Sequence, residues 1–144
     1  MIHTHRDPRR FVASLVSIVS ALRFMRSDDV DIEGLAAAME ITYKLFLEQA
    51  MAQRADGTVP NDQIVDTQFL DLMADPVAML RRVYEQLAME WPAGHDEVIK
   101  NYLAAKPKAK HGAHTYTFAD VGLDEDHVRD SFAAYVAHYG IREE

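Results

Sequence analysis

Only two segments of this 144-residue chain have the composition of β-strands, and this small number limits the folds open to it. Residues 2–5 (Ile-His-Thr-His) and 63–67 (Gln-Ile-Val-Asp-Thr) are short and rich in β-branched side chains. Each is followed by an Asp-Pro pair, at 7–8 and at 75–76, which is typical of a helix N-cap and first helical residue. Strands that alternate with helices predict parallel β-α units.

Helical periodicity accounts for most of the remaining chain. It predicts a helix over 8–26 that is apolar nearly all round and therefore packed on most sides, a second helix over 32–54, and C-terminal helices with a basic loop over 75–140. A sheet flanked by helices usually has about five strands, so two strands indicate a part of a larger α/β domain. The alternative is a helical bundle in which residues 2–5 are a frayed N-terminus.

Several classes of protein are excluded by what the sequence lacks. It has no cysteine, which removes disulfides, thiol catalysis and thiolate metal sites. Its six glycines are never closer than ten positions apart, so neither the dinucleotide-binding nor the Walker glycine loop can be present. The longest apolar region, 11–25, is interrupted by serines and an arginine and is shorter than the roughly 20 residues of a membrane span. No signal segment is evident either, and a cytoplasmic location is expected.

Charge is distributed unevenly along the chain. The net charge is −8, which argues against a general affinity for nucleic acid or an anionic membrane. Residues 1–26 nevertheless contain five arginines and a single acidic residue, Asp7. A small basic region on an acidic protein suits a discrete anion better than a polymer. The competing interpretation is that these arginines lie on a solvated face.

Arg6 and Ser14 are the strongest candidates for binding such an anion. Arg6 directly follows the first predicted strand, at the edge where open α/β sheets bind ligands. Ser14 lies about two helical turns into the next helix. A guanidinium supplies charge and a bidentate fork, and a serine adds one neutral hydrogen bond, so the two together suit a phosphate.

The surrounding residues resemble a known family. Residues 3–17, HTHRDPRRFVASLVS, resemble the 3′-phosphate-binding strand and helix of the bacterial sulfotransferases that use 3′-phosphoadenosine-5′-phosphosulfate (PAPS). Residues 68–76, QFLDLMADP, are similar to the family's Y-x-D-L-x-x-D-P segment, and residues 108–123 to its late basic loop. The resemblance implies that Arg6 and Ser14 bind the 3′-phosphate and that Phe69 lies by the adenine. It also implies phosphate contacts from Lys108, Lys110, His111 and Gly112.

This resemblance carries expectations about the whole chain. Residues 1–144 are expected to form a single partial domain, the C-terminal part of a P-loop-kinase-like parallel-sheet sulfotransferase, mostly helical with about two strands. The implied cofactor is PAPS or its desulfated product adenosine 3′,5′-bisphosphate (PAP), and the implied second substrate is a hydroxyl acceptor. The family's phosphosulfate loop and catalytic base lie upstream of the matched region. No catalytic residue is therefore assigned, and weak nucleotide binding without turnover is expected.

Two further hypotheses compete with or add to this one. An exposed sheet edge predicts self-association into a homo-oligomer. A small acidic helical interaction module without a nucleotide ligand would also account for the helix content and the acidic surface. His3 and His5 share one face of the predicted strand and could chelate a metal, but no third ligand is evident from the sequence, and no metal site is assigned.

Overall fold

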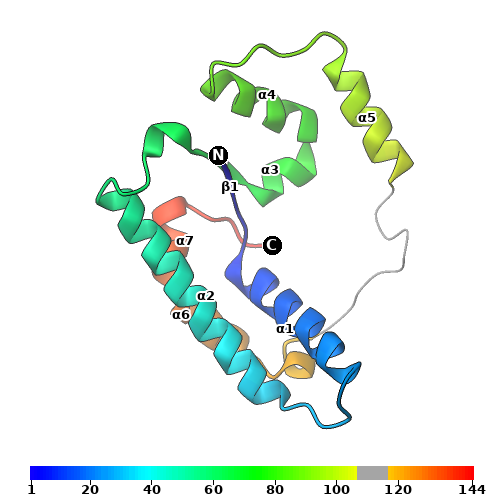
Figure 1. The fold of residues 1–144 in the computed structure, drawn as a ribbon, viewed down its shortest axis with the longest axis vertical. Helices are drawn as coiled ribbons and strands as arrows, with labels where there is room; N and C mark the ends of the chain where they lie inside the picture. Colours follow the sequence, from blue (N-terminus) through cyan, green and yellow to red (C-terminus); the bar gives the residue numbers. More distant parts are fainter. Residues whose placement is uncertain (107–116) are drawn as a thin grey trace. The chain divides into compact units, whose positions relative to one another are not determined.

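The structure, a computed structural model, describes residues 1–106 and 117–144. The chain divides into two compact units, and each is made from two separate stretches of sequence (Figure 1). The strand unit contains residues 1–5 and 60–114, and the helical unit contains residues 6–59 and 115–144. The boundary between them falls directly before Arg6.

A parallel two-stranded sheet forms the centre of the strand unit. β1 (Ile2–His5) pairs with β2 (Val65–Gln68) in a register that sets His3 opposite Asp66. Both predicted strands are therefore present, and the parallel pairing is confirmed. The frayed N-terminus of the helical-bundle alternative is wrong, because residues 2–5 are hydrogen-bonded in the sheet. β2 begins two residues later than predicted, since residues 61–63 form a 3-10 turn, η1 (Asn61–Gln63).

The described residues of the strand unit also form three helices: α3 (Phe69–Ala74), α4 (Pro76–Gln86) and α5 (His95–Ala105). The short α3 was not predicted. Asp75 caps α4 by accepting a hydrogen bond from the main-chain N–H of Ala78, as the Asp-Pro pair indicates. On one face of the sheet, Val65 packs against Met79 and Val83 of α4. The opposite face carries the side chains of alternate residues, His3 and His5 among them.

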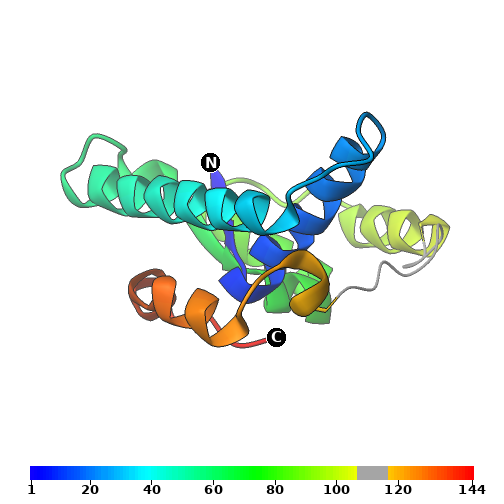
Figure 2. The ribbon, with the colours of Figure 1, turned by 90° about the horizontal axis from the view of Figure 1, so that it is seen from below.

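The helical unit is built around the first half of α1 (Pro8–Phe24). α2 (Ile32–Ala55) packs on one side of it and α6 (Glu125–Ser131) on another (Figure 2). The unit also contains the 3-10 turn η2 (Ala119–Val121) and α7 (Ala133–Tyr139). Among the described residues, its apolar core includes a cluster of buried side chains: Val12, Ala13, Val16, Leu35, Ala36, Val121, Val128 and Phe132.

One tight approach explains a glycine in this unit. Gly122 has a φ of 65°, a left-handed conformation that disfavours a side chain, and a Cβ there would lie 3.2 Å from the Cα of Glu33. A glycine therefore allows the turn after η2 to lie against the start of α2.

The second half of α1 differs from the prediction. Ile18 and Leu22 of α1, and Met25 directly after it, are largely exposed, so the expectation that this helix is packed on most sides is wrong for its last two turns. Only the stripe through Val12 and Val16 is covered by α2 and α6. None of the helices in the described part of the chain combines the length and apolar character that crossing a membrane requires.

Candidate anion-binding site

Arg6 lies at the junction between β1 and α1, and its guanidinium holds a carboxylate. Its Nε donates to both side-chain oxygens of Glu144, at 2.8 and 3.1 Å, and its Nη2 donates to Oε2 at 2.9 Å. This is the bidentate fork that guanidinium groups form with carboxylates and phosphates. The Glu144 side chain is only 13% exposed, although it belongs to the last residue of the chain.

Asp7 holds the start of α1 in place beside this pair. Its carboxylate accepts a hydrogen bond from the main-chain N–H of Arg9, which caps the helix, and two-pronged contacts from the Arg9 guanidinium at 2.7 to 3.1 Å. It also accepts a 3.3 Å hydrogen bond from the main-chain N–H of Glu144. The C-terminal segment is therefore attached to the N-terminus of α1 through both Arg6 and Asp7.

These contacts shift two pKa values in opposite directions. Burial alone would raise the pKa of Asp7, but the hydrogen bonds from Arg9 and from the main chain of Arg9 and Glu144 outweigh it and hold that pKa below its usual value. The hydrogen bonds to Asp7 likewise raise the pKa of Arg9 despite its partial burial. Both groups are therefore charged at neutral pH and neutralise one another, which leaves Arg6 and Arg10 as the cations of the region that contact Glu144.

Arg10 contacts Glu144, as Arg6 does, and lies on the helix face that carries Ser14. Its Nη2 donates to the main-chain oxygen of Glu144 at 3.1 Å. Arg10 and Ser14 are four residues apart and therefore lie on the same face of α1, one turn from each other. Ser14 is partly exposed. Two guanidinium groups, one hydroxyl and the positive end of a 17-residue helix thus come from one short stretch of sequence.

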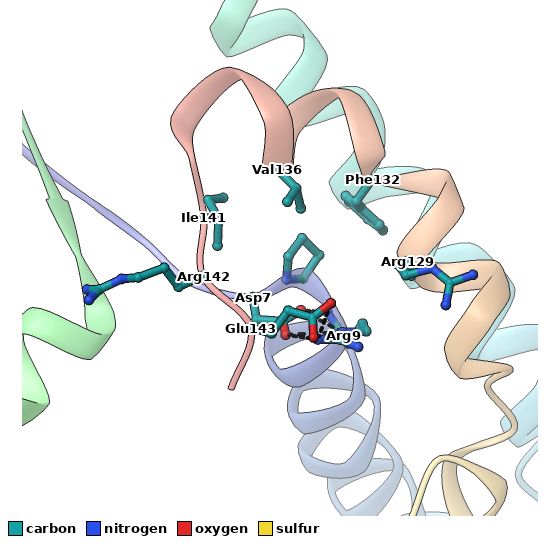
Figure 3. Close-up of a pocket in the computed structure, with 9 residues that line it drawn as sticks. Asp7, Arg9, Arg129, Phe132, Val136, Ile141, Arg142 and Glu143 are labelled. Carbon is teal, nitrogen blue, oxygen red and sulfur yellow. Dashed lines mark hydrogen bonds and ion pairs between the residues drawn. The ribbon is translucent and has the colours of Figure 1, made fainter.

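A small cavity lies under the C-terminal segment. Phe132, Val136 and Ile141 point toward the first turn of α1, where Asp7 and Arg9 form their ion pair (Figure 3). The cavity has a volume of about 30 Å³, which is room for a water molecule and not for a nucleotide. These apolar contacts hold residues 141–144 against α1, so the cavity supports the site without being a ligand pocket.

Of the other predicted site residues, Phe69 is the one that the structure describes. Phe69 is the first residue of α3, directly after β2, is partly buried, and belongs to the strand unit. The predicted phosphate contacts from the basic loop lie outside the described residues: Lys108, Lys110, His111 and Gly112.

Two residues of the candidate anion-binding site, Arg10 and Glu144, were not predicted from the sequence. Arg10 lies four residues before Ser14, and this helical spacing could have identified it as a second cation. Glu144 offers no local signal, because it lies 138 residues from Arg6 and only the folded C-terminal segment brings the two together.

Comparisons with known proteins identify the family of the chain. Residues 1–93 match the family described as "Sulfotransferase family". The fold is similar to that of sulfotransferase STF9 from Mycobacterium avium, with a TM-score of 0.80 and 20% identity over 97% of this chain and 36% of that one. It is also similar to sulfotransferase STF1 from Mycobacterium tuberculosis H37Rv, with a TM-score of 0.73 and 22% identity over 92% of this chain and 33% of that one.

The chain therefore spans about a third of the length of each of these two solved structures. Among curated proteins, none matches this sequence significantly. The predicted architecture, an α/β part of a sulfotransferase fold with two parallel strands and many helices, is confirmed by the structural similarity. The match over residues 1–93 covers β1, α1, α2, β2 and α4, and on this basis the chain belongs to the sulfotransferase family.

Proposed function

We propose that this chain carries the 3′-phosphate end of the PAPS and PAP site of a sulfotransferase that transfers a sulfuryl group to a hydroxyl acceptor. The proposal rests chiefly on the geometry of Arg6, whose fork already holds a pair of anionic oxygens at 2.8 to 3.1 Å. A phosphate monoester offers oxygens of similar spacing and carries more charge than a carboxylate. The orientation of the Arg6 guanidinium supports this role.

Neighbouring groups complete the proposed phosphate site. Arg10 supplies a second positive charge, Ser14 supplies a hydroxyl on the same helix face, and the N-terminus of α1 favours a negative charge nearby. For the ligand to bind through Arg6, the Glu144 side chain must leave the guanidinium. The nucleotide and Glu144 therefore compete for Arg6.

The remaining contacts are proposed from the family resemblance alone. Phe69 is assigned to the face of the adenine. Lys108, Lys110, His111 and Gly112 are assigned to the phosphates of the nucleotide. Sulfuryl transfer also requires stabilisation of the charge that develops on the bridging oxygen of the leaving nucleotide, and no residue of this chain is assigned to that role. Binding of PAP without turnover is therefore the expected behaviour of these 144 residues.

Calorimetric titration with two nucleotides tests the proposal. PAP and 5′-AMP differ in the 3′-phosphate, so PAP should bind more tightly if Arg6 and Ser14 hold that group. Arg26→Ala is a matched control for Arg6→Ala, because Arg26 is an exposed arginine beyond the opposite end of α1. Equal affinities for PAP and 5′-AMP, or an equal effect of the two substitutions, would contradict the assignment of a 3′-phosphate site to Arg6 and Ser14.

A second candidate function has one supporting observation. Ile41, Leu45 and Phe46 of α2 are each more than half exposed, which suits a helical module that binds another protein. That function predicts a folded protein to which neither nucleotide binds. The same titration therefore separates the two candidates.

A further inference from the structure

We infer that His3, His5 and Asp66 form a binding site for a divalent transition-metal ion, zinc in the first place. The site lies wholly within the strand unit and does not depend on the proposed nucleotide function. Its three ligand atoms lie within 4.8 Å of one another. No other three His, Asp or Glu side chains converge in this way in the part of the chain that the structure describes.

The sheet itself brings the three side chains together. His3 and His5 are two positions apart on β1, so their rings project from the same face. The parallel register sets Asp66 of β2 directly opposite His3 and therefore on that face as well. The third ligand that the sequence did not reveal thus comes from the neighbouring strand, more than 60 residues away.

The distances agree with a shared metal ion. His5 Nε2 lies 2.8 Å from Asp66 Oδ1, and His3 Nδ1 lies 3.9 Å from the same oxygen. Tetrahedral zinc, with bonds of about 2.0–2.2 Å to nitrogen and oxygen, separates its ligand atoms by roughly 3.4 Å. One observed distance is shorter and one is longer, so small side-chain rotations would bring both to that value.

One side of the proposed metal site is buried and the other side is partly exposed to solvent. The His5 side chain has no exposed surface, whereas the side chains of His3 and Asp66 are partly exposed. The two imidazole rings lie with their centroids 4.1 Å apart and tilted by 46°. A metal ion can therefore reach the site from the side of His3 and Asp66 and bind against a histidine that packing holds in place.

The donor set identifies the class of ion. Two imidazoles and one carboxylate suit zinc and its neighbours in the first transition series, and they suit the oxygen-preferring ions magnesium and calcium poorly. Bound zinc would join β1 to β2 through side chains in addition to the main-chain ladder. Because a two-stranded sheet is only marginally stable on its own, this cross-link has a structural role.

Zinc chloride titrated into the full 144-residue protein tests the site. The wild type should bind one equivalent, and cobalt should give the visible bands of a low-symmetry site. Loss of an outer-shell partner already weakens metal sites by about 10–100-fold, so His3→Ala and Asp66→Asn should each weaken zinc binding at least tenfold. His138→Ala, which removes an exposed histidine from α7, should change nothing. His5 is left intact, because its buried ring supports the fold.

Thermal unfolding supplies a second readout. Zinc should raise the unfolding temperature of the wild type and of His138→Ala, and should leave that of His3→Ala and Asp66→Asn unchanged. Thr4→Val removes the 3.0 Å side-chain hydrogen bond to Thr67 and serves as a control for general damage to the sheet, because it should keep the response to zinc. The same zinc affinity in every variant, or no binding to the wild type at millimolar zinc, would overturn the assignment.

Discussion

The guanidinium of Arg6 and the carboxylate of Glu144 form a bidentate ion pair between residues 138 positions apart. In the proposed function this pair competes with the 3′-phosphate. Glu144→Gln should therefore raise the affinity for PAP by a factor of about 1.4 to 5, because a partly exposed ion pair contributes about 0.2–1 kcal/mol. Calorimetry with PAP measures the change.

Glu143 provides the matched control for this substitution. Its side chain is 77% exposed and approaches Arg9 at 3.5 Å. Glu143→Gln should leave the affinity for PAP within error of the wild type. If the two variants behave alike, net charge and not the Arg6 contact would explain the result.

Substitutions at Arg6 and Ser14 should differ in size. Arg6→Ala should weaken PAP binding by about 1.5–3 kcal/mol, the range for a hydrogen bond to a charged group, and Ser14→Ala by about 0.5–1.5 kcal/mol. Neither should change the affinity for 5′-AMP, which lacks the 3′-phosphate. A loss of affinity for both nucleotides in parallel would place Arg6 away from the 3′-phosphate.

The stability of the helical unit should depend on the charge of Asp7. Its pKa is lower in the folded protein than the usual value near 3.9, so the stabilisation is fully present above about pH 4 and is lost as the pH falls through the lower, folded value. Urea unfolding between pH 2 and 7 measures this loss.

Two variants separate the charge of Asp7 from its role as a helix cap. Asp7→Asn retains a good N-cap and removes the charge, so its stability should vary less with pH at the acidic end than that of the wild type. Asp7→Ala also removes the cap, which should cost a further 0.5–2 kcal/mol or so. An acid profile of Asp7→Asn identical to that of the wild type would assign the loss to other carboxylates.

Phe132 is expected to be the most sensitive core position of the helical unit. It is 2% exposed and lies between α6 and α7, where it packs with α1. Phe132→Ala should destabilise the protein by about 3–5 kcal/mol, a large part of a typical domain's stability. Phe46→Ala, at a position 61% exposed, should cost much less. Denaturant unfolding compares the two.

The exposed apolar side chains of α2 should bind a hydrophobic dye and promote self-association. Ile41 and Leu45 are one turn apart and both are largely exposed. Leu45→Glu should reduce dye fluorescence and shift size-exclusion elution toward the monomer. Lys44→Glu makes a larger change in charge without removing apolar surface and should not have this effect. Unchanged dye fluorescence and elution for Leu45→Glu would exclude this face of α2 as the site of self-association.

Local patterns were sufficient to predict the starts of α1 and α4 and the position of β1. The Asp-Pro pairs at 7–8 and 75–76 begin α1 and α4, because capping depends on neighbouring residues only. The β-branched run at 2–5 forms β1 as predicted. Short α3 escaped prediction because its six residues directly follow a strand and give periodicity too little length.

Contacts between distant segments were not predictable in the same way. Whether Leu22 is buried depends on which helices pack beside α1, and its apolar character alone indicated burial. Asp66 is identified as the neighbour of His3 only from the register of the sheet. Glu144 reaches Arg6 through the fold of the C-terminal segment, in which Ile141 is buried. Contacts between such distant residues leave no pattern in the local sequence.

Because β1 belongs to the strand unit and α1 to the helical unit, neither unit can be produced as one continuous piece of chain. A protein made from residues 60–114 alone would contain β2 with no strand to pair with it. Residues 2–5 can join β2 only when a segment of nearly 60 residues closes into a loop, which carries an entropic cost. We therefore expect the sheet to form late in folding, after the helices that the intervening segment contains.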